Sequence, residues 1–204
     1  MRGEARSAKR LEAFSDGVMA IIVTLTVFGL KPPASSDFRD LLGIWPNVAS
    51  YSVSFAFVAI IWINHHHLVQ SARRVDTAAL WANMAMLFSM SFIPFASGYL
   101  AAHVTSPLPV ALYAGLFFLC LLAFNGLSAA ISRRRPAGDD LARRKDRAAG
   151  RKNAIALGLY LAAIPLAFLS TWLSLVIVVC VSMLFVRPAS WPQAGKAPAA
   201  SPGS

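Results

Sequence analysis

The sequence is poor in cysteine and in acidic side chains. Its 204 residues include 2 Cys and 9 Asp and Glu, and charged residues make up only 14% of the chain. Both cysteines, Cys120 and Cys180, lie within apolar stretches, so a disulfide-stabilised scaffold and a thiolate metal site have little support. With 57% hydrophobic residues and a mean hydropathy of +0.58, the composition excludes an ordinary soluble domain and predicts an integral membrane protein.

Long apolar runs predict an all-α fold with six transmembrane helices. A helix needs about 20 apolar residues to cross a hydrocarbon core of about 30 Å. The last run, 154–186, is too long for one span and contains Pro165 and a turn signal at 170–172, so we divide it in two. The predicted spans are 13–31, 47–70, 78–102, 108–132, 152–169 and 171–187, which together form one domain of residues 1–187.

Basic residues indicate the orientation of these spans. Positively charged short loops stay on the cytoplasmic side of a membrane. Basic residues precede the first span, follow the second and the sixth, and nine of the 19 fall in the loop 133–152. We therefore expect a multi-pass protein of the cell membrane with both termini in the cytoplasm. The segment 188–204 is rich in Pro, Ala, Gly and Ser, which predicts a disordered cytoplasmic tail.

The loop 133–152 has two possible kinds of partner. A run of Arg and Lys can bind nucleic acid, and the net charge of the chain is +10. Positive charge is, however, what the topology rule predicts at this place, and the loop also contains acidic residues. We therefore expect anionic lipid headgroups, and no nucleic acid, as its partner.

The first span carries polar residues on an otherwise apolar helix. Asp16 lies near its start, which argues against a cleaved signal peptide, because a signal core has no use for a carboxylate. At about 100° per residue, five residues of this helix fall on one stripe: Gly17, Ile21, Thr24, Leu25 and Phe28. Asp16 falls on a different stripe. From periodicity alone, the first stripe could face lipid, another helix of the same chain or a pore.

A carboxylate within a membrane normally has a partner. Arg10 is one candidate, and the run W-I-N-H-H-H at 62–67, near the end of the second span, is the other. Its histidines should lie at a similar depth to Asp16. We predict a polar latch of Asp16, Ser15, Asn64 and one or two of the histidines 65–67. Adjacent histidines on a helix point about 100° apart, so they do not converge on one ion, and no metal site is predicted.

Two motifs carry a resemblance to a known family. The first span contains R-x-x-x-F-S-D-G and the second contains W-x-N-H-H, both of which resemble the endolysosomal potassium channel family, the transmembrane-protein-175 family, in its prokaryotic branch. The length and the six spans resemble the same family. The residues that match are Arg10, Phe14, Ser15, Asp16, Gly17, Trp62, Asn64, His65 and His66.

The resemblance implies a homotetrameric channel, selective for potassium or weakly selective among monovalent cations, with the first helix of each subunit lining the pore. It implies pore layers at Ile21, Thr24, Leu25 and Phe28, and no cofactor other than the permeant potassium ions. Apolar rings could then gate by dewetting, with Thr24 as a hydroxyl collar. Many relatives have an aliphatic residue at the position of Phe28, so the layer formed by Phe28 would be either bulkier or turned aside. Arg10 would need acidic or carbonyl partners such as Glu12 or Asp16, because an unpaired ring of arginines would repel cations.

Two other classes of function compete with a channel. In a proton-coupled secondary transporter, Asp16 and the histidines would form a titrating relay, although no inverted repeat is evident. A structural membrane protein would conduct no ions. An enzyme is not expected, because Asp16 is the only acid within a span and no nucleophile and base recur together.

Overall fold

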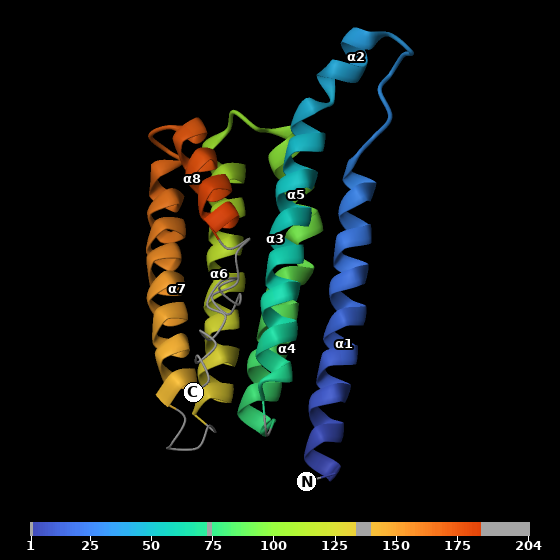
Figure 1. Ribbon diagram of the computed structural model, residues 1–204. Coiled ribbons are helices and arrows are strands. Elements are labelled where there is room, and N and C mark those ends of the chain that lie inside the picture. The colour runs from blue at the N-terminus through green and yellow to red at the C-terminus, as the bar shows by residue number, and fades with distance from the viewer. Residues whose placement is uncertain (1, 73–74, 134–139, 185–204) are drawn as a thin grey trace, which may run out of the picture.

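A computed structural model describes residues 2–72, 75–133 and 140–184 (Figure 1). The described residues form helices and no strand, which confirms the all-α fold. The elements are α1 (Arg2–Thr26), the 3₁₀ turn η1 (Val27–Gly29), α2 (Phe38–Gly43), α3 (Trp45–Gln70), α4 (Thr77–Ser91), α5 (Ile93–Ala102), α6 (Pro107–Ser132), α7 (Asp140–Leu166) and α8 (Thr171–Leu184). The predicted tail 188–204 and residues 134–139 of the basic loop lie outside the described residues.

Four helical segments in the described part of the chain are long and apolar enough to cross a membrane. They are Ala8–Gly29, Trp45–Gln70, Thr77–Ala102 and Pro107–Ser132. The third consists of α4 and α5, which meet at Phe92, just before Pro94. The first four predicted spans fall on these segments. The described parts of α7 and α8 are not both long and apolar enough to meet this requirement, so six membrane crossings remain a prediction.

The long run 154–186 is divided between α7 and α8. Pro165 lies in the last turn of α7, and because proline has no N–H it cannot continue the hydrogen bonds of the helix. Ser170 then accepts a hydrogen bond of 3.3 Å from the backbone N–H of Leu173 and begins α8. The hydroxyl of Ser174 donates to the carbonyl of Ala163 at 2.8 Å and ties α8 to α7.

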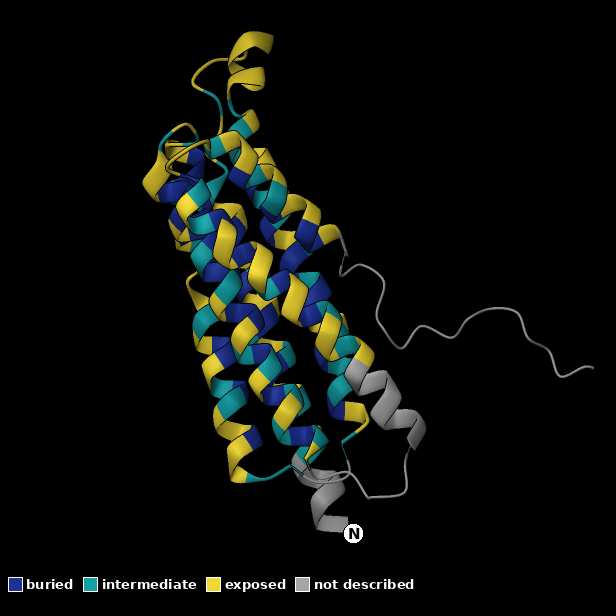
Figure 2. Cartoon of the chain, turned by 90° about the vertical axis from the view of Figure 1, so that its left-hand side faces the viewer, coloured by how far each residue is buried: buried dark blue, intermediate teal, exposed yellow. Residues whose placement is uncertain are grey.

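The core lies between α3, α4, α6 and α7. The rings of Phe57 and Phe117 stack with centroids 3.8 Å apart, and Tyr160 meets both edge-on. Buried residues follow the inward sides of these helices, and exposed residues cover the outer surface (Figure 2). The helix α1 stands at one edge of the bundle and α7 at the opposite edge (Figure 1). This leaves one side of α1 uncovered by the other described residues.

Candidate functional site

The two sides of α1 differ in their burial. Residues at intervals of three and four face α3, α4 and α5 and are buried: Leu11, Ser15, Met19, Ile22 and Thr26. On the other side, Ile21 is 58% exposed, Leu25 46% and Phe28 78%, and Gly17 and Thr24 are exposed as well. The stripe predicted from the sequence is therefore the side of α1 that no other part of the described subunit covers.

The C-terminal end of this stripe is not an α-helix. The α-helix ends at Thr26, and residues 27–29 form a 3₁₀ turn that is closed by a hydrogen bond of 2.9 Å from Leu30 N to Val27 O. A 3₁₀ turn advances about 120° per residue and an α-helix about 100°. Phe28 is therefore rotated by about 40° from its position on a continuous α-helix, toward the direction of Leu25. It stays on the exposed side.

The hydroxyl of Thr24 has a defined direction. It donates its single hydrogen to a backbone carbonyl of α1, either Ile21 O at 2.9 Å or Ala20 O at 3.1 Å. The oxygen then has only lone pairs to offer on its exposed side. Thr24 thus presents a hydrogen-bond acceptor on an otherwise apolar stripe, which is the polarity that suits a cation.

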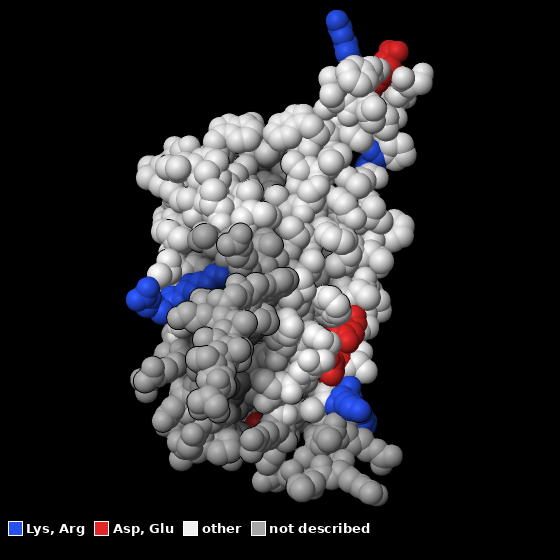
Figure 3. Space-filling model, in the orientation of Figure 1, with Lys and Arg blue, Asp and Glu red and all other residues white. Residues whose placement is uncertain are grey.

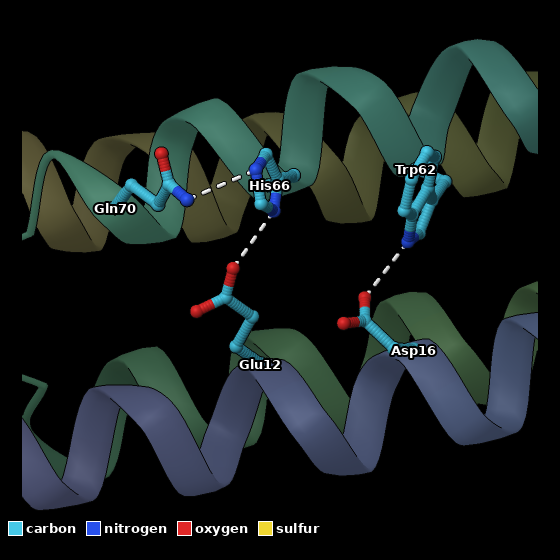
Figure 4. A network of polar contacts seen from close by, with 5 residues as sticks. All are labelled: Glu12, Asp16, Trp62, His66 and Gln70. Atoms are coloured by element: carbon cyan, nitrogen blue, oxygen red, sulfur yellow. Dashed lines mark hydrogen bonds and ion pairs between the residues drawn. The ribbon is translucent and has the colours of Figure 1, made fainter.

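Two contacts join the middle of α1 to α3 (Figure 4). The indole Nε1 of Trp62 donates to Oδ1 of Asp16 at 2.8 Å, and Oε1 of Glu12 lies 2.8 Å from Nδ1 of His66. Gln70 Nε2 lies 2.9 Å from His66 Nε2. Because an amide nitrogen only donates, His66 Nε2 accepts from Gln70, which leaves Nδ1 as the ring nitrogen on the side of Glu12. Asp16 and Glu12 are one turn apart and hold the same side of α1.

A second, fully buried network joins three helices. Asn83 of α4 donates from Nδ2 to the hydroxyl of Ser15 at 3.0 Å, and its Oδ1 lies 2.9 Å from Nε2 of His65 on α3. Because Oδ1 only accepts, His65 carries its proton on Nε2. All three side chains are buried, and Nδ1 of His65 has no hydrogen-bond partner among the described residues. This network fixes the middle of α1 against α3 and α4.

The predicted latch differs from these two networks at several residues. Asn64 does not meet Asp16, because its amide donates to the carbonyl of Ile60 in its own helix at 2.7 Å. Asp16 meets Trp62 rather than a histidine. In the described structure, neither Glu12 nor Asp16 pairs with Arg10. Arg10 is exposed on the same side of α1 as Phe14 and Gly17. The expectation that Glu12 or Asp16 would hold Arg10 is therefore not met.

Sequence reasoning missed three members of these networks: Asn83, Gln70 and the role of Glu12. Gln70 follows His66 by four residues, so helical spacing could have indicated their contact. Glu12 precedes Asp16 by four residues and lies on the same side for the same reason. Asn83 is 68 residues from Ser15, and nothing local in the sequence marks their contact.

Charge is sparse on the surface of the bundle. Figure 3 shows that most of the upper half of the bundle, on the face drawn, has no Asp, Glu, Lys or Arg. Among the described residues, no group of three or more His, Cys, Asp or Glu side chains is placed to hold a metal ion. Within the described part of the chain, the polar chemistry of the site consists of the contacts of α1 with α3 and α4 and of the Thr24 hydroxyl on the uncovered side of α1.

Comparison with known proteins identifies relatives of the chain. The family described as "Endosomal/lysosomal potassium channel TMEM175" matches residues 10–94, which include both motifs. A potassium channel of Chamaesiphon minutus is 34% identical over 186 residues, covering 84% of this chain and 89% of the relative. A potassium channel of Chryseobacterium sp. is 41% identical over 124 residues, which are 61% of this chain and 65% of the relative, just under two thirds of its length.

Two further matches extend the comparison. A human protein named "Endosomal/lysosomal proton channel TMEM175" is 30% identical over 116 residues, covering 51% of this chain and 23% of the human protein. The crystal structure of a lysosomal potassium-selective channel TMEM175 homolog from Chamaesiphon minutus matches with a TM-score of 0.79 and 30% identity, covering 91% of this chain and 99% of that one. The resemblance drawn from the motifs is confirmed, and the chain belongs to the TMEM175 family.

Proposed function

We propose that this chain is the subunit of a homotetrameric channel that conducts potassium ions passively through a pore lined by α1. Relatives in two bacterial genera are named potassium channels, and the solved relative is described as potassium-selective. The observation that carries the proposal is the uncovered side of α1, on which Ile21, Leu25 and Phe28 are exposed and Thr24 offers an oxygen. Four copies of this side around one axis would enclose a narrow path.

The chemistry of that path follows from its side chains. Rings of Ile21 and Leu25 would form an apolar constriction that excludes water when narrow and gates by dewetting. Between them, four Thr24 oxygens would replace part of the hydration shell of a cation, since each hydroxyl hydrogen is already engaged with the backbone. Without a cage of backbone carbonyls, we expect modest selectivity among monovalent cations. Potassium is the permeant ion, and no cofactor takes part.

The anchors behind α1 support the same function. A helix that lines a pore must keep one side toward the axis, and a rotation of one residue would replace Ile21 by Ile22. Asp16, Glu12 and Ser15 oppose that rotation, because each has a partner on α3 or α4. Bonds to two neighbouring helices restrain both the tilt and the rotation of α1.

The setting of the channel also belongs to this proposal. Both termini face the cytoplasm of the cell membrane, as the basic loops suggest. Arg133, Arg151 and Lys152, at the described ends of α6 and within α7, would lie at the inner headgroup boundary, where anionic lipids are their partners.

Recording of the purified protein in planar bilayers under opposed potassium and sodium gradients tests the proposal. A channel gives a reversal potential that follows the potassium gradient, and Leu25→Ala, which widens the constriction, raises the conductance. A secondary transporter would give coupled, saturable exchange without unitary currents, and a structural protein would give no flux. A reversal potential that follows only a proton gradient would contradict potassium conduction.

A further inference from the structure

The outer end of α1 is tied to the rest of the subunit by one side chain. The amide Nδ2 of Asn47, in the first turn of α3, donates a hydrogen bond of 3.1 Å to the carbonyl of Gly29. Gly29 is the last residue of the turn η1, and both residues are partly buried. Carbonyls at the end of a helix have no partner within the helix, so they bind side chains or water. Asn47 supplies such a partner from a neighbouring helix.

Within the described residues, no other side-chain hydrogen bond joins η1 to another helix. Thr26, just before the turn, is buried, but its hydroxyl donates to carbonyls of its own helix, Val23 O at 2.7 Å or Ile22 O at 2.9 Å. The bond from Leu30 to Val27 also lies within the turn. The hydrogen bond from Asn47 to Gly29 is therefore the directional contact that favours one conformation of the turn over another.

The conformation of this turn sets the direction of Phe28. As a 3₁₀ turn, residues 27–29 place Phe28 about 40° away from its position on a continuous α-helix. The ring of Phe28 is 78% exposed, so contacts within the subunit hold it only weakly. A change between the two turn geometries would move a bulky ring across the outer end of the exposed stripe.

We propose that Asn47 is a positioning residue for the outer layer of the pore: its hydrogen bond to Gly29 holds the 3₁₀ turn and so fixes the direction of Phe28. The effect on ions rests on the proposed function, because the direction of Phe28 matters for conduction only if α1 lines a pore. The effect of Asn47 on the turn itself does not rest on the proposed function. Asn47 touches no ion and acts through Phe28.

The first experiment measures the turn without measuring conduction. Phe28→Cys is introduced together with Cys180→Ser, which removes the exposed native cysteine, while Cys120 is buried. The protein in nanodiscs is treated with a charged methanethiosulfonate, and the modification rate of Cys at position 28 is followed by mass spectrometry. We expect Asn47→Leu and Asn47→Asp each to change this rate about fivefold and in the same direction, because one net hydrogen bond shifts the equilibrium between the turn conformations by about that factor.

The two replacements control for each other. Asn47→Asp keeps the shape and removes the donor, whereas Asn47→Leu removes the donor without adding charge. Ser52→Ala is the matched control, because that hydroxyl of α3 donates only to Val48 O in its own helix. Unchanged rates in both Asn47 variants, or an equal change in Ser52→Ala, would overturn the proposal. If Asn47→Leu does not assemble as the wild type does, the modification rate of the Asn47→Asp variant alone tests the proposal.

The second experiment measures single-channel conductance in symmetrical potassium. We expect Asn47→Leu to change the conductance by at least about twofold, because the ring lies at a constricted layer. In a Phe28→Ala background the same replacement should have no effect. An effect of equal size in that background would show that Asn47 acts elsewhere and would overturn the role for Phe28. If the wild type conducts no ions, the proposed function fails, while the modification rates still test the role of Asn47 in the turn.

Discussion

The indole N–H of Trp62 and the carboxylate of Asp16 meet at 2.8 Å, although 46 residues separate them in the chain. Trp62 lies on α3 and Asp16 on α1, so the bond crosses the boundary between the helix with a free side and the body of the subunit. Both residues belong to the motifs by which the sequence resembles its family. Their contact explains why a carboxylate is kept on an apolar helix: it holds α1 from behind.

The bond between Asp16 and Trp62 predicts a measurable coupling. Trp62→Phe and Asp16→Ala should each lower the free energy of unfolding. The double variant should lower it by less than the sum of the two single losses, and the difference, the coupling energy, should be about 1 kcal/mol. The value is modest because the bond lies on an exposed part of the subunit. Thermal unfolding of the four proteins of this double-mutant cycle in one detergent measures it.

Asp16→Asn provides the control for this cycle. An asparagine keeps the oxygen that accepts from Trp62, so it should retain most of the stability that Asp16→Ala loses. If both variants unfold at the same temperature, or if the cycle is additive, the bond does not contribute to holding α1.

Replacement of Asn83 by Leu should destabilise the protein more strongly than loss of the Trp62 bond. Asn83→Leu is close in volume but leaves Ser15 and His65 buried without their partner, at a cost of about 2 to 4 kcal/mol. Ser89→Ala, on the exposed side of α4, is the matched control, because its hydroxyl bonds only to Ala85 O. A shift of the unfolding midpoint for Asn83→Leu no larger than that for Ser89→Ala would contradict the role of Asn83.

The oxygen of Thr24 should matter more for conduction than for folding. Thr24→Val keeps the branched shape and removes the hydroxyl, so we expect an unchanged unfolding temperature and a potassium conductance lowered about tenfold, because an ion in the collar loses about 1.4 kcal/mol of stabilisation. Thr24→Ser, which keeps the oxygen, should conduct as the wild type does. Bilayer recording of the three proteins compares them. Equal currents in Thr24→Val and wild type would place this oxygen away from the ions.

Tyr113 joins α6 to α3 through its hydroxyl. Its OH lies 2.8 Å from the hydroxyl of Ser54, and both side chains are buried. Tyr113→Phe should lower stability by about 0.6 to 2 kcal/mol, the range measured for polar contacts between membrane helices. Tyr51→Phe, on a partly exposed ring of α3, is the comparison. Tyr113→Phe should leave the conductance unchanged, since Tyr113 lies behind α3 and not on the free side of α1.

The residues of the exposed stripe of α1 were predictable because the sequence there forms a regular helix, whereas their exposure was not. At a fixed angle per residue, Ile21, Thr24 and Leu25 share a side whatever surrounds them. The division of α7 from α8 was predictable for a similar local reason, since Pro165 and Ser170 act on their own turn.

Other features depend on contacts that are distant in the sequence. The 3₁₀ turn at Phe28 accompanies a bond from Asn47, which is 18 residues from Gly29, and no propensity of residues 27–29 specifies it. In the same way, the pattern showed that Asp16 needs a partner, but it did not distinguish Trp62 from the histidines beside it. Trp62 and His66 lie on the same side of α3, one turn apart, so the choice between them depends on how far α3 is shifted along α1.

The turn between α7 and α8 offers a place for a reporter. Leu169 in this turn is 84% exposed, and the helices that it joins stand on the side of the bundle away from α1 (Figure 1). A fluorophore or an epitope attached there would leave Asn47, Asp16 and their partners untouched. Energy transfer between such labels would therefore count subunits and follow their spacing in a membrane while the candidate conduction path stays as it is.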